Sequence, residues 1–135
     1  IGGSSSRNDD DVWEGTRYRD FTLGRNFSPD PQRGSGLTGG SRDASSLGKG
    51  CVGKIDASPD HRLTITSRVN LRIFVQSDTD STLVILGPGG PRCDDDSHGM
   101  LDPEINAVFE PGEYEIYVGH MGDMGEYRLT VTENL

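Results

Sequence analysis

The chain is poor in apolar residues and has no long apolar run. Only 31% of its 135 residues are hydrophobic and 7% are aromatic, and no apolar stretch approaches the roughly 18 residues of a membrane-spanning helix. Glycine and proline take their place, with 19 and 7 residues. This composition disfavours a membrane span or a helical bundle, and it favours one domain of short strands joined by many turns.

Basic residues are scarce beyond the first third of the chain, and the net charge is −9. Residues 1–50 carry seven acidic and seven basic side chains. Residues 51–135 carry 15 and 6, so the whole negative excess (15 − 6 = 9) lies there. Such a surface repels phosphate backbones and anionic lipids. We therefore expect no nucleic acid partner and no membrane insertion, and a surface that favours cations.

Only two cysteines are present, Cys51 and Cys93, and their separation fits no zinc motif. They form either a disulfide or two reduced, buried thiols. A disulfide closing a loop of about 40 residues stabilises by on the order of 4 kcal/mol in the chain-entropy model, and it is typical of an oxidising compartment. The start at Ile1 instead of Met fits removal of a signal peptide, although a trimmed chain would look the same. A secreted, extracellular protein is expected.

Alternation of apolar and polar residues, typical of half-buried strands, dominates the chain after residue 50. Turns rich in glycine, proline and aspartate separate the runs. The predicted strands are 19–23, 51–55, 62–67, 71–76, 82–86, 105–110, 113–119 and 126–132. Short strands at this spacing predict an all-β fold, an antiparallel, jelly-roll-like β-sandwich over residues 50–135.

Residues 1–49 are expected to form an extended N-terminal arm, because residues 1–7 and 34–41 have the composition of a flexible linker. The arm either folds back on its own sandwich or lies on a neighbouring subunit. A strand donated to a neighbour's sheet edge builds a filament when it is repeated, so a homo-oligomer or filament is expected. The candidate docking residues of the arm are Trp13, Tyr18, Phe21, Leu23 and Phe27.

Two residues of this arm have a second interpretation. Trp13 is either an anchor that packs on the sandwich or a platform for a sugar ring. Asn26, in Asn26-Phe27-Ser28, is either an N-glycosylation site or part of a chance triplet.

An acidic segment at residues 93–104 is the strongest candidate for a metal site. Ca²⁺ binds six to eight oxygen ligands, which a loop of carboxylates and carbonyls can supply. The segment is not an EF-hand, because His98 and Ile105 stand where ligands belong. The other interpretation is a solvated acidic turn. The candidate calcium ligands are Asp78, Asp80, Asp94, Asp95, Asp96 and Asp102.

Five segments in succession resemble the bacterial pre-peptidase C-terminal domain family. They are Asp80-Ser81-Thr82-Leu83-Val84-Ile85, Gly87-Pro88-Gly89-Gly90, Cys93-Asp94-Asp95-Asp96, Pro111-Gly112-Glu113-Tyr114 and Tyr127-Arg128-Leu129-Thr130-Val131. The resemblance spans about residues 50–133. It implies a jelly-roll-like β-sandwich, secretion to the bacterial surface or medium, and calcium at the acidic loops. Family members accompany secreted hydrolases as non-catalytic modules, and related domains bind collagen or polysaccharide.

Catalytic motifs are missing from the sequence. His61, His98 and His120 have no zinc-binding spacing, and there is no G-x-S-x-G nucleophile motif. We therefore expect a calcium-binding, non-catalytic structural or adhesive module that self-assembles through its arm. The alternative is a carbohydrate- or protein-binding accessory domain of a secreted hydrolase.

Overall fold

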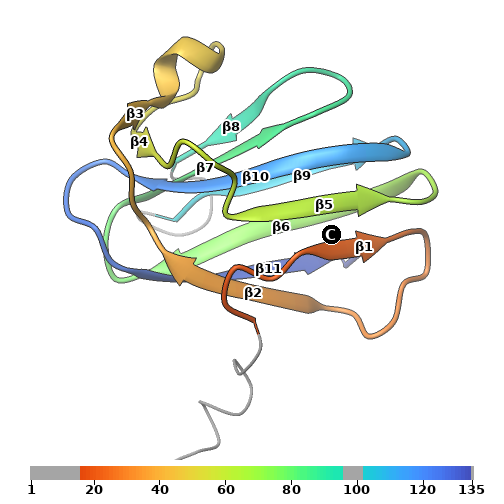
Figure 1. Cartoon of the computed structure of the whole chain (residues 1–135). Coiled ribbons are helices and arrows are strands. Elements are labelled where there is room, and N and C mark those ends of the chain that lie inside the picture. The colour runs from red at the N-terminus through yellow and green to blue at the C-terminus, as the bar shows by residue number, and fades with distance from the viewer. Residues whose placement is uncertain (1–15, 96–101, 135) are drawn as a thin grey trace, which may run out of the picture.

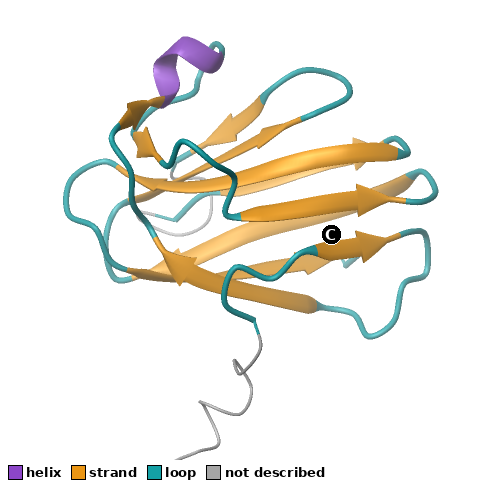
Figure 2. Ribbon diagram, viewed as in Figure 1, coloured by secondary structure: helices purple, strands orange, loops and turns teal. Residues whose placement is uncertain are grey.

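The computed structural model describes residues 16–95 and 102–134. In these residues the chain is almost entirely β-strand and forms two sheets packed face to face (Figures 1 and 2). The helix seen in this part of the chain is a single 3-10 turn, η1 (Ala44–Leu47). The all-β sandwich predicted from the alternation of apolar and polar residues is therefore confirmed.

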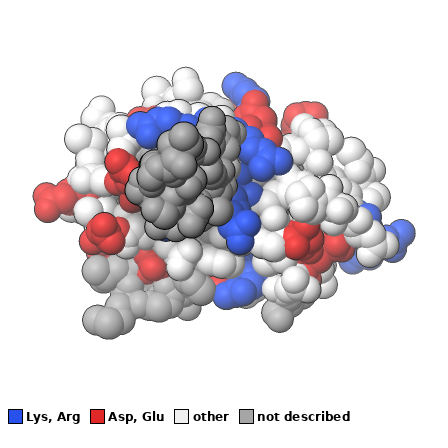
Figure 3. Space-filling model, turned by 90° about the horizontal axis from the view of Figure 1, so that it is seen from below, with Lys and Arg blue, Asp and Glu red and all other residues white. Residues whose placement is uncertain are grey.

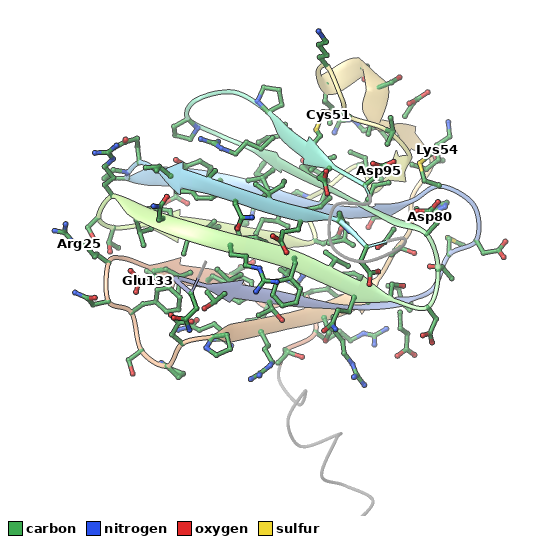
Figure 4. All side chains as sticks on the ribbon, turned by 180° about the vertical axis from the view of Figure 1, so that it is seen from behind. Arg25, Cys51, Lys54, Asp80, Asp95 and Glu133 are labelled. Atoms are coloured by element: carbon green, nitrogen blue, oxygen red, sulfur yellow. A yellow bond between two sulfur atoms is a disulfide. The ribbon has the colours of Figure 1, made fainter. Side chains whose placement is uncertain are left out.

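The smaller sheet has four antiparallel strands. Their order across the sheet is β2 (Gln32–Leu37), β11 (Glu126–Thr132), β6 (Val69–Ser77) and β9 (Glu104–Phe109). Seen from behind, these strands lie side by side across the near face of the molecule (Figure 4).

The larger sheet is built around the long strand β10 (Gly112–His120). One edge of β10 pairs with β7 (Ser81–Leu86), which pairs in turn with β8 (Arg92–Asp94). Two strands share the other edge, with one outer strand beside each: β5 (His61–Ile65) with β1 (Phe21–Leu23), and β4 (Lys54–Ile55) with β3 (Arg42–Asp43). Among these strand pairs only β1 and β5 run parallel.

Alternate residues of the two sheets meet in one core. Burying each Leu or Ile side chain stabilises the fold by about 1.5–3 kcal/mol, and this core holds most of them. The fully buried aliphatic residues include Leu63, Leu71, Ile73, Val75, Leu83, Ile85, Ile116, Val118, Leu129 and Val131. A second, smaller cluster lies beneath η1 and includes Ala44, Ile55 and Tyr117.

The N-terminal segment differs from the predicted arm wherever the structure describes it. From residue 16 to residue 49 it supplies strands to both sheets, and Phe21 and Leu23 are buried in the common core. The sandwich therefore begins well before residue 50. The boundary was misplaced because β2 contains Gly34-Ser35-Gly36, a sequence that is typical of a linker.

The glycines of β2 are in a strand because aromatic rings fill the space of their missing side chains. A Cβ at Gly34 would lie 2.8 Å from Cε1 of His61, and a Cβ at Gly36 would lie 2.7 Å from Cε1 of Tyr18. Close packing of this kind leaves no room for a methyl group. The two glycines thus let β2 close over the rings instead of loosening the chain.

Candidate functional site

Two of the predicted calcium ligands, Asp80 and Asp95, lie towards the same end of the sandwich (Figure 4). Asp78 is exposed on the turn before β7, and Asp96 lies outside the residues that the structure describes. Within residues 16–95 and 102–134, no three His, Cys, Asp or Glu side chains are grouped closely enough to hold a metal ion. The described residues therefore do not form a calcium site by themselves, and calcium stays a prediction.

Two of these aspartates hydrogen-bond the backbone of neighbouring strands. An Oδ2 atom of Asp94 accepts a hydrogen bond from the Glu104 N–H at 2.8 Å. An Oδ1 atom of Asp102 accepts one from the Ser77 N–H at 3.3 Å. These contacts tie the ends of the acidic segment to β9 and β6, which is a structural role that the sequence pattern did not separate from metal binding.

The two cysteines form the predicted disulfide. Cys51 and Cys93 are bonded across a sequence separation of 42 residues. The bond joins the loop before β4 to β8 and lies against the small cluster beneath η1. A disulfide fits an oxidising compartment. No helix in the part of the chain that the structure describes is long and apolar enough to cross a membrane.

The residues predicted to dock on a neighbour pack on the chain's own sandwich where they are described. Phe21 and Leu23 are 2% and 1% exposed, and Phe27 packs on the same core. Tyr18 is 44% exposed, and its hydroxyl accepts a hydrogen bond from the Leu37 N–H at 3.1 Å. Trp13 lies outside the described residues.

Asn26 stands on an exposed turn with a positive φ of 64°. Its backbone N–H donates a hydrogen bond to the Glu133 side chain at 2.9 Å, which leaves the amide group of its side chain on the surface. Glycosylation of this residue stays a prediction.

His61 is buried and joins three segments. Its Nδ1–H donates to the Arg19 carbonyl, and its Nε2 accepts a hydrogen bond from the Tyr127 hydroxyl at 2.7 Å. Burial lowers the pKa of His61 and raises the pKa of Tyr127, so the ring stays neutral and the phenol keeps its proton. These hydrogen bonds hold the segment before β1 to both sheets. Because the side chain of His61 is 0% exposed, it does not contact a substrate.

Asp60 is also buried and fills the gap between β4 and β5 along the edge of β10. Its N–H donates to the Ile116 carbonyl at 2.9 Å, and its Oδ2 accepts from the Val118 N–H at 2.8 Å. The Asp56 side chain forms a further hydrogen bond with the Asp60 carboxyl, which requires a proton between the two. Burial, reinforced by this contact, raises the pKa of Asp60 to about 8.

The outer face of the four-stranded sheet carries a concentration of arginines. Cross-strand pairing sets its outward side chains in three rows. From the β2 edge the rows are Arg17-Ser35-Arg128-Gln76, Arg33-Thr130-Phe74-Glu104 and Thr132-Arg72-Asn106. We call this surface the arginine face, after Arg17, Arg33, Arg72 and Arg128. Its rows hold four basic side chains and one acidic one, in a chain with a net charge of −9.

A hollow of about 470 Å³ opens on the arginine face. It is lined by Pro31, Arg33, Arg72, Phe74, Gln76, Thr130, Thr132 and Asn134. Thr130 and Thr132 are only 7% and 4% exposed, because the longer side chains beside them cover them. The lining combines an aromatic ring, two guanidinium groups, two amides and two hydroxyls.

Arg72 is held in place at the edge of this hollow. Its Nε–H donates to Oε1 of Glu104 at 3.0 Å, and its guanidinium carbon lies 4.5 Å from the centre of the Phe74 ring. A guanidinium that stacks on a ring and pairs with a carboxylate loses little further freedom when it binds a ligand.

Lys and Arg side chains also gather beside the β2 edge of this sheet. Seen from below, they form a band near the middle of the view, between Asp and Glu side chains (Figure 3). Arg19 belongs to the same region, since its guanidinium donates to the side chain of Gln32 at 3.0 Å and to the Arg33 carbonyl at 3.3 Å.

The arginine face was missed from the sequence, although its signal was present. In Leu71-Arg72-Ile73-Phe74-Val75-Gln76 the apolar residues alternate to one side, and Phe74 breaks the polar series on the other. A single aromatic residue on the solvent side of a strand is ordinary by itself, so this signal is weak. The sequence could not show that Arg33 and Arg128 would lie next to it, because β2 was taken for a linker.

Comparisons with known proteins identify no family. No protein-family model matches the chain, and no curated protein matches it. Three solved structures resemble it over 84% of its length, with identities of 14–16%. The pre-peptidase C-terminal domain of collagenase from Bacillus anthracis has 16% identity, 94% of its length covered and a TM-score of 0.49.

The other two structures are periplasmic inhibitors of g-type lysozyme. The inhibitor from Aeromonas hydrophila, PliG, has 14% identity, 96% of its length covered and a TM-score of 0.43. A mutant of the Escherichia coli inhibitor has 15% identity, 96% covered and a TM-score of 0.41. At these values the likenesses decide neither family nor function, so the functional argument rests on the chain's own residues.

Proposed function

We propose that this chain is a non-catalytic, extracellular accessory module that binds an extended ligand across its arginine face. The observation that carries the proposal is the hollow of about 470 Å³ on the outside of the four-stranded sheet. Its lining of aromatic, guanidinium, amide and hydroxyl groups is suited to a polar ligand with some apolar surface. An open face that crosses three strands suits a polymer better than a small molecule.

A non-catalytic role is supported by the use of the polar residues inside the sandwich. The His61 ring has both nitrogens engaged by Arg19 and Tyr127. The Asp60 carboxyl is engaged by the backbone of β10. A general acid or base must come within hydrogen-bonding distance of its substrate, and neither buried residue lies on the arginine face.

An extracellular location is supported by the disulfide between Cys51 and Cys93, because such bonds persist in oxidising compartments. The sandwich as a whole supplies a rigid support for the binding face. Its strands fix the spacing of the arginines, so that little conformational freedom is lost when a ligand binds.

The test is retention of the full chain on immobilised polymers: neutral and acidic polysaccharides, and collagen. Phe74→Ala removes the aromatic floor of the hollow, and we expect binding to the retained polymer to weaken at least tenfold. The matched control is Thr64→Ala, on the outer face of the larger sheet. Retention on none of the polymers, or retention that Phe74→Ala and Thr64→Ala leave equally unchanged, would overturn the proposal.

Calcium binding and self-assembly remain separate proposals from the sequence pattern. Melting the protein with calcium and with excess chelator, while following light scattering, tests both. An ion present at about 100 times its dissociation constant stabilises the fold by about 2.7 kcal/mol, which is a shift of several degrees. An unchanged melting temperature would reduce Asp94, Asp95 and Asp96 to a solvated turn. Particles that persist under chelation would separate assembly from calcium.

A further inference from the structure

We propose that the ligand of the arginine face is a neutral, linear polysaccharide that lies in a groove along β11. This inference rests on the proposed function, since it names the ligand class of the same hollow. Amides, hydroxyls and apolar groups of the lining would hold the sugar rings. The arginines around the hollow would keep the contacts that they already make within the protein, and so would hold the walls of the groove in place.

The hollow has the shape of a groove because short side chains on β11 lie between longer ones on the neighbouring strands. Thr130 is opposite Arg33 of β2 on one side and Phe74 of β6 on the other. Thr132, the next outward residue of β11, is opposite Arg72. The two threonines therefore form the floor, and the longer side chains beside them form the walls. A groove that follows a strand suits a linear polymer.

The groove is long enough for several sugar rings. Gln76 lies opposite Arg128 at one end. Thr132 is four residues farther along β11 (132 − 128 = 4), which is about 14 Å at the rise of an antiparallel strand. Asn134 follows, and its backbone N–H donates to Oγ1 of Thr132 at 3.0 Å. A single sugar ring would reach one end of the groove, whereas an oligosaccharide can contact the amides at both ends.

The charged groups of this face already have partners within the chain. Arg72 donates to Oε1 of Glu104 at 3.0 Å and lies over the Phe74 ring. Arg33 and Arg128 also interact with other groups of the protein. An anion would have to compete with these contacts, on a protein whose net charge is −9. A cation would meet no carboxylate among the described residues that line the hollow. A neutral ligand leaves these contacts intact.

The other groups of the lining match the chemistry of a sugar. Gln76 and Asn134 are exposed, and each side-chain amide can both donate and accept hydrogen bonds, as a sugar hydroxyl does. The methyl groups of Thr130 and Thr132 and the ring of Pro31 are apolar and can contact the C–H groups of a sugar ring. A neutral sugar uses both kinds of group at once.

A protein partner fits this groove less well. A stable protein–protein interface buries about 800 Å² per partner around an apolar centre, whereas the floor of this groove consists of threonine. An extended peptide gains its specificity from pockets for alternate side chains. The rings of the lining are those of Pro31 and Phe74, and Arg72 already lies over the second.

The experiment measures the binding of soluble oligosaccharides to the full chain by titration calorimetry. The neutral probes are hexasaccharides of cellulose, xylan and mannan, and the acidic probe is the hexasaccharide of polygalacturonate. A chelator is present, so that calcium cannot bridge the acidic probe to the protein. We expect a neutral probe to bind at least tenfold more tightly than the acidic one. Its affinity should be the same at low and high salt, and it should fall when the probe is shortened to a disaccharide.

Two variants locate the ligand in the groove. Thr130→Gln fills the floor with a longer neutral side chain, and the resulting clash should weaken binding about tenfold. Gln76→Ala removes one amide and should weaken binding about fivefold, as expected for a lost hydrogen bond. The matched control is Thr64→Gln on the outer face of the larger sheet, which should bind as the unmodified protein does. Thermal melting shows whether each variant is folded, and Gln76→Ala decides if Thr130→Gln is not.

Tighter binding of the acidic hexasaccharide would overturn the neutral class. Binding of a neutral probe that is equal in Thr130→Gln, Gln76→Ala and Thr64→Gln would overturn the groove. If no oligosaccharide binds, but collagen or another polymer is retained in a manner that depends on Phe74, the proposed function survives without this inference. If no tested binding depends on the groove or on Phe74, both fail.

Discussion

Asp60 and His61 are adjacent in the chain, and both are buried at the start of β5, yet they meet opposite surroundings. His61 lies between a carbonyl and a hydroxyl, which a neutral ring satisfies completely. Asp60 accepts one backbone N–H and shares a proton with a second carboxyl, that of Asp56. Burial keeps both side chains neutral in the folded state, but it lowers the pKa of His61 and raises the pKa of Asp60.

The difference gives the two residues opposite dependences on pH. Burial lowers the pKa of His61 from 6.5, so its contribution to stability is complete above 6.5 and is lost as the pH falls below that value. The pKa of Asp60 is raised from 3.8 to about 8, so its contribution is complete below 3.8 and is lost as the pH rises through 8. Stability should be greatest in mildly acidic solution.

The largest effect on stability is expected when His61, whose two ring nitrogens both have hydrogen-bond partners, is removed. His61→Ala leaves the Tyr127 hydroxyl and the Arg19 carbonyl without their partner and creates a cavity beside Gly34. Together these should cost about 4 kcal/mol of unfolding free energy. Urea unfolding measures the change. The control is Arg62→Ala, the next residue, whose side chain is exposed. A loss below about 1 kcal/mol would show that His61 and its two hydrogen bonds contribute little.

The proton shared by Asp60 is tested by Asp60→Asn. An amide accepts from the Val118 N–H and donates to Asp56 without titrating, so it imitates the protonated acid. Deprotonation of Asp60 should cost the unmodified protein about 3 kcal/mol of stability between pH 5 and pH 8. Asp60→Asn avoids this loss and should be the more stable of the two at pH 8, since the contribution of His61 is the same in both proteins. Melting at both pH values measures this. Equal slopes for the two proteins would place the proton elsewhere; Asp20, which faces His61, and Asp56 are the neighbouring acids.

Much of the fold could be read from the sequence, for a physical reason. Period-two alternation encodes which side of a strand is buried, and the strand at residues 126–132 was predicted to the residue. The strand β2 could not be predicted, because two of its inward positions are glycines and the third is the polar Gln32. The space at those positions is filled by side chains that include Tyr18, His61 and Tyr127. The amino acids of β2 themselves do not indicate these distant residues.

Of the features described as candidate sites, those formed by residues close in the chain were predictable, and those assembled from several strands were not. The disulfide followed from composition and is confirmed. The acidic loop was conspicuous because its charges are consecutive in the chain, whereas the arginine face is assembled from β2, β6 and β11 and from a residue before β1. Charges that gather through cross-strand register cannot be seen by reading along the chain. The same limit hid the contact between Asp56 and Asp60, of which Asp60 is buried against β10.

A smaller effect is expected when His61 is displaced rather than removed. In Gly34→Ala the new methyl group would lie 2.8 Å from Cε1 of His61 and 3.0 Å from Cζ of Phe21. The ring must shift, and overpacking of this kind costs about 2 kcal/mol. Gly122→Ala is the control, because nothing lies within 4 Å of its Cβ. If both variants melt alike, β2 can move away from the ring, and the tight fit around His61 is not what distinguishes it from Asp60.

The smallest effect is expected on the surface, and it separates stability from binding. Arg33→Gln and Arg128→Gln should each change the unfolding free energy by less than about 0.5 kcal/mol, because the hydrogen bonds of β2 and β11 use backbone atoms. Thermal melting at pH 6 checks this. Buried polar residues such as Asp60 and His61 stabilise the fold from within, whereas the side chains of Arg33 and Arg128 lie on the outer face of the sheet. A loss above about 1 kcal/mol in either variant would assign that arginine to the fold and weaken the case for a binding face.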